Sequence, residues 1–185
     1  ITTYSFSELS EEVKQKAIEN ERNSESFLGG RWWMNAYLEH TEKLEKLGYV
    51  NPQMAFSGFW NQGDGASFTC QVDLETWIKG KDKYKPLSRF ISDGEIEASI
   101  TRLASQYPHE NTCTAEVAYW IDSIHPKIGA LIYQLEAELE AERLELCKSL
   151  YKDLKEEYER LSSDKYIAED LEANEAEFLE DGSIY

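Results

Sequence analysis

The chain has 185 residues, of which 41% are hydrophobic and 12% aromatic, and its formal net charge at pH 7 is −17. This length and composition exclude a disordered chain and leave room for one domain with a core, or a domain with an extension. The negative charge argues against a DNA-binding surface of the usual basic kind, because phosphate binding needs clustered Lys and Arg.

The three cysteines and the distribution of apolar residues predict the cellular location of the protein. Cys70, Cys113 and Cys147 are far apart and show no CxxC spacing, so neither a disulfide framework nor a zinc knuckle is expected. No apolar run approaches the roughly 20 residues that a membrane span needs. The first residues lack the basic region and apolar core of a signal peptide. We therefore expect a cytoplasmic protein without a membrane segment.

The N-terminal quarter predicts a strand and two helices. Alternating β-branched and aromatic residues favour a short strand over residues 2–6. A helix should follow, capped by Ser7 or Ser10, with acids in its first turns. A second helix is expected over about residues 31–47, because Gly48 stands where a helix C-terminal glycine is common.

The stretch from Met54 to Val72 predicts a β-hairpin around which the fold is organised. Two runs rich in aromatic residues flank a polar, glycine-rich centre at residues 61–65. Asp64-Gly65 is a strong turn dipeptide, and Gly63 and Gly65 can adopt a positive φ without steric cost.

The segment after the hairpin predicts two helices and one strand. Asp73 can cap a short helix over residues 74–79. Asp93-Gly94 is expected to open a helix that runs to about Tyr107, because its apolar residues recur at helical spacing. Residues 112–120 alternate in polarity, which predicts a half-buried strand in the same sheet as the hairpin.

The C-terminal third predicts two helices. Residues 126–162 contain no glycine after Gly129, and their apolar residues recur every four and every eleven positions, which is typical of a long, nearly straight helix. A last helix is expected over residues 164–180. The long helix would pack within the chain or, as the alternative, associate with a second copy through a coiled-coil-like seam.

These elements together predict an α+β fold. It would have a small antiparallel β-sheet centred on the hairpin, packed by helices, and a long C-terminal helical hairpin. Residues 1–125 would form the α+β core domain, and residues 126–185 an acidic helical part packed on it or projecting from it. The residues expected in the core are Trp33, Tyr37, Phe56, Phe59, Phe68, Ile100, Val117 and Leu135.

Most of the excess negative charge lies near the C-terminus. Between Glu136 and Asp181 there are 17 acids and 6 bases, a net charge of −11. Such a concentration either keeps a protein soluble or forms an acidic face that competes with nucleic acid for a basic partner.

The hairpin tip is the candidate binding site. Asp64, with neighbouring polar groups, could bind a metal or a polar ligand, or could only hydrogen-bond its own turn. None of the three histidines has a metal-ligand spacing, so no metal, no other cofactor and no catalytic residue is predicted. The predicted binding residues are Trp60, Asn61, Gln62, Asp64 and Ser67.

Three segments resemble a family of small bacteriophage proteins, some of which are labelled antitoxin of a toxin–antitoxin system. They are the opening Tyr4–Ile18, the central Phe56–Phe68, and the ending from Asn174 through Phe178 to Gly182. The resemblance spans most of the chain. It implies a phage protein that acts on a host component in the bacterial cytoplasm.

Two hypotheses about function follow. The favoured one is a non-enzymatic inhibitor that binds a basic surface of a bacterial host protein, such as a defence-system component or a toxin, and does not itself bind nucleic acid. The long helix would also allow a homodimer. The alternative is a small enzyme, or a nucleotide- or metal-binding protein, that uses the Gly63-Asp64-Gly65 loop with Asp64 and His109 as its polar groups.

Overall fold

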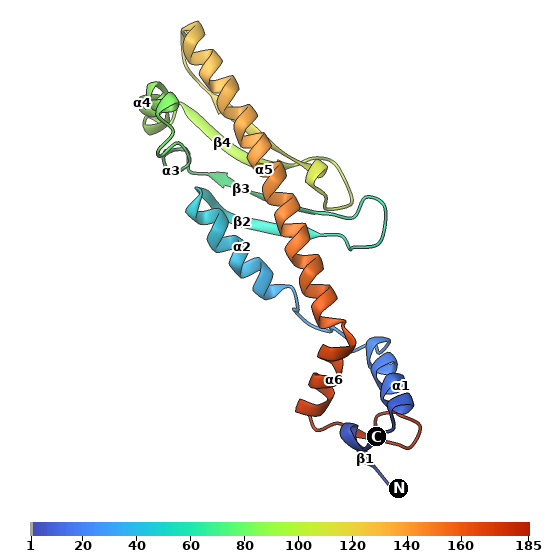
Figure 1. Cartoon of the computed structure of the whole chain (residues 1–185). Coiled ribbons are helices and arrows are strands. Elements are labelled where there is room, and N and C mark those ends of the chain that lie inside the picture. Colours follow the sequence, from blue (N-terminus) through green and yellow to red (C-terminus); the bar gives the residue numbers. More distant parts are fainter. Residues whose placement is uncertain (1) are drawn as a thin grey trace. The chain divides into compact units, whose positions relative to one another are not determined.

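A four-stranded antiparallel sheet organises the larger part of the computed structural model, which describes residues 2–185 (Figure 1). Its strands follow one another in space in the order β2-β3-β4-β5, so each pairs with its sequence neighbour. They are β2 (Tyr49–Phe56), β3 (Ala66–Val72), β4 (Ile96–Arg102) and β5 (Cys113–Tyr119). Together with the helices described below, the sheet makes this an α+β protein, as predicted.

The chain forms two compact units. Unit 1 contains the residues up to Met34 and those from Leu154 onward, and unit 2 contains Asn35–Asp153. This grouping differs from the division expected between residues 125 and 126, because the N-terminal residues join the C-terminal ones. The long helix α5 (Pro126–Leu161) contributes residues to both units.

The predicted hairpin is confirmed. Strands β2 and β3 pair antiparallel, with Met54 opposite Phe68 and Phe56 opposite Ala66. The connecting residues 57–65 contain no helix, and Gly63 has a φ of 92°, as a turn in the left-handed region requires. The pairing shifts register between Val50 and Gln53, which is a bulge in the edge strand β2.

The helix predicted from Asp93-Gly94 to Tyr107 is wrong, because this segment contains strand β4. The spacing of four between Ile96 and Ile100 fits a helix, but it also fits one face of a strand. Burial decides between them: Ile96, Ala98 and Ile100 are buried, and the alternate positions are more exposed. Pairing on both sides holds the segment extended, since Ile100 lies opposite Cys70 in β3 and Ala115 in β5.

Helices of unit 2 bury one face of the sheet. Figure 1 shows α5 passing along the strands, and its Ile132, Leu135 and Leu139 share one hydrophobic cluster with Phe68 and Ile100. The remaining helices of this unit are α2 (Met34–Lys46), α3 (Leu74–Trp77), η2 (Asp82–Leu87), α4 (Ser88–Ser92) and η3 (Glu110–Thr112). The other face of the sheet carries a shallow hollow lined by Val50, Gln53, Thr69, Gln71, Ser99 and Thr101.

The predicted core is half correct. Phe59, Phe68, Ile100 and Leu135 are buried. By contrast, Trp33, Tyr37, Phe56 and Val117 are only partly buried. Tyr37 and Phe56 contact each other edge to face, with ring centroids 6.4 Å apart, so an aromatic pair forms without full burial.

The outer edge of β5 is bonded to side chains of α5. The backbone N–H of Ala115 donates to Glu140 at 2.8 Å, and that of Val117 donates to Glu136 at 3.1 Å. Glu136 and Glu140 are one helical turn apart, and Ala115 and Val117 are alternate strand residues, so the two spacings match. The helix thereby satisfies donors that an edge strand would otherwise leave open.

Unit 1 is built from the two ends of the described chain. Its elements are β1 (Tyr4–Ser5), η1 (Phe6–Glu8), α1 (Glu11–Arg22), α6 (Asp164–Ala173) and β6 (Glu177–Phe178). Ser10 caps α1 as predicted, and β1 is a shorter form of the expected strand. The last helix ends at Ala173 rather than at 180, because the chain reverses at Glu175, where φ is 52°, to pair β6 with β1.

Unit 1 has a hydrophobic cluster of its own. Phe178 is fully buried, and its ring lies 5.8 Å from that of Phe6. Ile18 of α1 and Leu171 of α6 belong to the same cluster. Phe178, which was expected in the last helix, therefore reaches the cluster from strand β6.

The hairpin predicts a strong dependence of stability on Phe68. Its side chain is 1% exposed, so Phe68→Ala removes a fully buried ring and should lower the free energy of unfolding by about 3–5 kcal/mol. Phe56→Ala should cost less, because Phe56 is partly exposed. Urea denaturation measures both. If both variants unfold at the wild-type midpoint, the hairpin is not part of the core.

Candidate functional site

The loop between β2 and β3 is organised by Asp64. One oxygen of its carboxylate, Oδ2, accepts the backbone N–H of Trp60 at 2.9 Å and that of Asn61 at 2.7 Å. A side chain at position 58 would crowd this carboxylate, because its Cβ atom would lie 3.0 Å from Oδ2. The φ of 134° at Gly58 also favours glycine there. Asp64 thus stabilises the loop by accepting hydrogen bonds from the loop backbone. This is the structural role that the sequence offered as one of the two alternatives for Asp64.

The five predicted binding residues do not share one surface. Trp60 is 67% exposed, and Asn61 and Gln62 are exposed beside it in the loop. Asp64 is only partly exposed, and Ser67 is buried in β3 opposite Ala55. The loop therefore presents Trp60, Asn61 and Gln62, while Ser67 belongs to the sheet.

The segment before β5, which contains Pro108 and His109, packs against this loop. Ser57 Oγ donates to the carbonyl of Pro108 at 2.9 Å and accepts the N–H of Gly65 at 3.1 Å. A Cβ atom at Gly65 would lie 2.7 Å from the His109 ring, so only glycine allows this approach. His109 Nε2 in turn lies 3.2 Å from the Glu110 carboxylate. The two loops that could hold a polar ligand are thus in direct contact.

Next to Glu110, Arg143 and Cys147 of α5 form a buried cluster with Cys113, which the sequence does not predict. Arg143 is 2% exposed, and its guanidinium donates to both carboxylate oxygens of Glu140 and to the carbonyl of Glu110. Its Nη1 lies 3.2 Å from Cys113 Sγ and 3.8 Å from Cys147 Sγ. The sequence shows only the spacing of four between Arg143 and Cys147, and nothing in it places Cys113 beside them.

The cluster divides the two thiols by acidity. The hydrogen bond from Cys147, followed by the positive charge of Arg143, lowers the pKa of Cys113 to about 6 although burial opposes this. The pKa of Cys147 is raised, first by its hydrogen bond to Cys113 and then by burial. Cys113 is therefore the more acidic thiol of the pair, and Cys147 the less acidic one.

The acids of α5 in unit 2 largely bond within the chain. Glu136 and Glu140 accept backbone N–H groups of β5, and Glu138 pairs with Lys83. Glu142 accepts the hydroxyl of Tyr49 at 2.8 Å and the indole N–H of Trp77 at 2.9 Å. These carboxylates have structural partners, so they are not the free acidic face that their number suggests.

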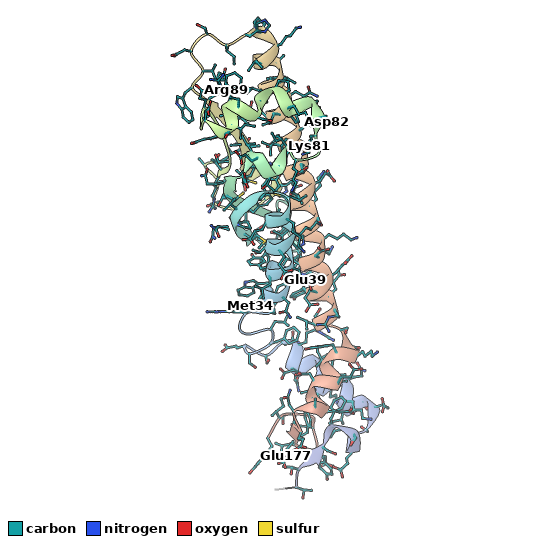
Figure 2. The ribbon with its side chains drawn as sticks, turned by 90° about the vertical axis from the view of Figure 1, so that its left-hand side faces the viewer. Met34, Glu39, Lys81, Asp82, Arg89 and Glu177 are labelled. Carbon is teal, nitrogen blue, oxygen red and sulfur yellow. The ribbon has the colours of Figure 1, made fainter. Side chains whose placement is uncertain are left out.

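The net negative charge is larger in unit 1 than in unit 2. This unit holds 17 acids and 7 bases, a net charge of −10, whereas unit 2 holds 19 acids and 12 bases, a net charge of −7. An open groove of about 610 Å³ lies between the N-terminal segment and the end of α6. The residues that line the acidic groove include Tyr4, Phe6, Glu8, Glu172, Glu175 and Glu177, the last of which is labelled in Figure 2.

In residues 2–185, no three His, Cys, Asp or Glu side chains are grouped so that they could hold a metal ion. None of the helices in this range is both long and apolar enough to cross a membrane.

The role of Asp64 generates a prediction about the loop. Asp64→Ala leaves the N–H groups of Trp60 and Asn61 without their acceptor and should lower the free energy of unfolding by about 1–2 kcal/mol. Gln62→Ala is the matched control: Gln62 is exposed in the same loop, so its loss should change stability by less than about 0.5 kcal/mol. Thermal denaturation measures both. Equal stability of the Asp64 variant and the wild type would contradict this role.

Comparison with known proteins assigns the chain to a family. No curated protein and no solved structure matches it. One family model does match, over residues 32–164, which include all of unit 2 and are well over half of the chain. Its description is "Domain of unknown function (DUF8835)", and the chain belongs to this family.

Proposed function

We propose that the protein is a phage-encoded, acidic, non-enzymatic inhibitor that binds a basic surface of a bacterial host protein. The observation that carries the proposal is the acidic groove of unit 1. Its carboxylates Glu172, Glu175 and Glu177 are exposed, in contrast to the bonded carboxylates of α5. Exposed carboxylates are available to a partner, because no internal contact has to be broken before they bind.

The groove combines charge with apolar surface. Tyr4 and Phe6 line it together with the carboxylates. A lysine or arginine side chain could place its aliphatic part against the rings and its charged end beside the acids. Charge complementarity of this kind accelerates association and makes binding sensitive to salt. A basic surface that normally binds nucleic acid would be blocked by the same contacts.

The host and the location come from the resemblance to bacteriophage proteins, which implies action in the bacterial cytoplasm on a defence-system component or a toxin. The family match ends at residue 164, before the groove carboxylates on α6 and β6. The proposal therefore concerns residues of this chain that the family model does not cover, and unit 2 is the part that the family defines.

The alternative function uses the Gly63-Asp64-Gly65 loop in a small enzyme or in a nucleotide- or metal-binding protein. The contact of His109 with Gly65 favours it, because two candidate polar segments meet there. The backbone bonds of Asp64 weigh against it, since they occupy one of the two carboxylate oxygens that a ligand would need. A rise in melting temperature with a nucleotide or divalent cation, lost in Asp64→Ala, would favour the alternative.

A homodimer through the long helix would need surface other than its leucine row. Leu135, Leu139 and Leu146 are buried in the hydrophobic cluster of unit 2. Tyr133, which is 76% exposed on the same helix, marks a face that remains accessible. Sedimentation analysis of the wild type and of Tyr133→Glu addresses this possibility.

The groove predicts where neutralisation weakens binding. The test variant changes Glu172, Glu175 and Glu177 to Gln, and its matched control changes Glu39, Glu42 and Glu45 to Gln, which are three exposed acids of α2 (Glu39 in Figure 2). Each variant loses three negative charges, so the two have the same net charge. Proteins captured from bacterial lysate at low salt are identified, and the Kd of the captured partner is then measured. The groove variant should bind about tenfold more weakly, and the control should bind like the wild type.

Two results would contradict the proposal. Equal weakening by both variants would mean that net charge alone drives retention. A Kd that does not change between low and high salt would mean that carboxylates do not carry the contact.

A further inference from the structure

We propose that Cys113 and Cys147 form a redox-active dithiol, which a peroxide converts into an intramolecular disulfide. The two sulfur atoms lie 3.8 Å apart, although the residues are 34 positions apart in the chain. Cys113 is the first residue of β5 and Cys147 belongs to α5, so the bond would join the sheet to the helix. Both thiols are free and both are buried.

Arg143 makes this pair chemically asymmetric. Its Nη1 is closer to Cys113 Sγ, at 3.2 Å, than to Cys147 Sγ, at 3.8 Å. Glu140 and the carbonyl of Glu110 hold the guanidinium in place, so its charge is directed at the sulfurs. The lowered pKa of Cys113 agrees with this geometry. Cys113 is thus the attacking sulfur, and Cys147 is the resolving thiol.

The reaction balances with hydrogen peroxide as the oxidant. The Cys113 thiolate attacks one peroxide oxygen, the O–O bond breaks, and the products are a sulfenic acid on Cys113 and hydroxide. The Cys147 sulfur then attacks the Cys113 sulfur and displaces the sulfenic hydroxyl, while the Cys147 proton leaves with it as water. The two sulfurs lose two electrons together, and the peroxide is reduced to one hydroxide and one water; the hydroxide takes up the proton that Cys113 released to solvent when it ionised.

The surroundings allow a small oxidant to reach the pair. Cys113 follows directly after residues 103–112, all of which are exposed or partly exposed. Its sulfur lies 4.0 Å from the carbonyl of Glu110 in that segment, and we infer that a small oxidant reaches it when this loop opens. The sulfurs must then approach to the roughly 2.0 Å of a disulfide, a movement of about 1.8 Å that side-chain rotation on a strand and a helix can supply.

Cys70 provides a control within the same molecule. It is less buried than the pair, so it is at least as accessible to solvent. Burial raises its pKa to about 12, and it therefore remains a protonated, poorly nucleophilic thiol at neutral pH. If solvent exposure decided which thiol is oxidised, Cys70 would react first. If the proposed dithiol is correct, Cys113 reacts first.

The experiment treats the reduced, folded full-length chain with hydrogen peroxide at pH 7, then denatures it and labels the remaining thiols with a maleimide. Peptide mapping should find one labelled cysteine, Cys70, and one cross-linked peptide pair, Cys113 with Cys147, lighter by two hydrogen atoms. The rate of cross-linking should fall as the pH is lowered through about 6, because the Cys113 thiolate becomes protonated.

Three variants assign the steps. Cys147→Ser should stop at a sulfenic acid on Cys113, which dimedone traps, and Cys113→Ser should leave Cys147 reduced. Cys70→Ser is the matched control and should cross-link at the wild-type rate. A melting curve for each variant establishes that it is folded.

The peptide map of the peroxide-treated wild-type protein is sufficient to test the proposal. Three labelled thiols after treatment, oxidation of Cys70 before the pair, or sulfinic acid on Cys113 without a bond to Cys147 would each overturn the proposal.

Discussion

The row of side chains that α5 sets against β5 is the contact on which unit 2 depends. Glu136 and Glu140 accept two backbone N–H groups of the edge strand, and Arg143 continues the row to the carbonyl of Glu110. The same helix buries its leucines against the sheet, so one element covers the face and occupies the edge. Removing one partner of such a buried network leaves a charge or donor unsatisfied, which costs more than the bond contributes.

Much of the fold could be predicted from local pattern, and the errors have physical causes. The hairpin, β5 and α5 were predictable because turn residues, alternation and glycine-free leucine spacing each favour one structure. Strand β4 was missed because Ile96 and Ile100 fit both periods, and pairing with two neighbouring strands decides between them. At the candidate site, Asp64 and its turn were predictable, but the burial of Ser67 and the approach of Arg143 to Cys113 depend on contacts between segments distant in sequence.

Charge has two different uses in this chain. In unit 2 the carboxylates of α5 bond to Lys83, Tyr49, Trp77 and the edge of the sheet, so they contribute to folding. In unit 1 a net charge of −10 surrounds a small hydrophobic cluster, and repulsion among these groups opposes compaction. A sequence count adds both kinds together, and only the partners of each carboxylate separate structural acids from those available for binding.

Strand β2 has a consequence for how the protein can meet other chains. Its Pro52 has no N–H, Asn51 has a φ of 49°, and the bulge between Val50 and Gln53 bends the strand. With β5 already bonded to α5, neither border of the sheet offers a regular ladder for an added strand. Fibril-like stacking and recognition of extended peptides by main-chain pairing are both disfavoured. Specificity toward any partner must then reside in side chains, which single substitutions can alter without refolding the scaffold.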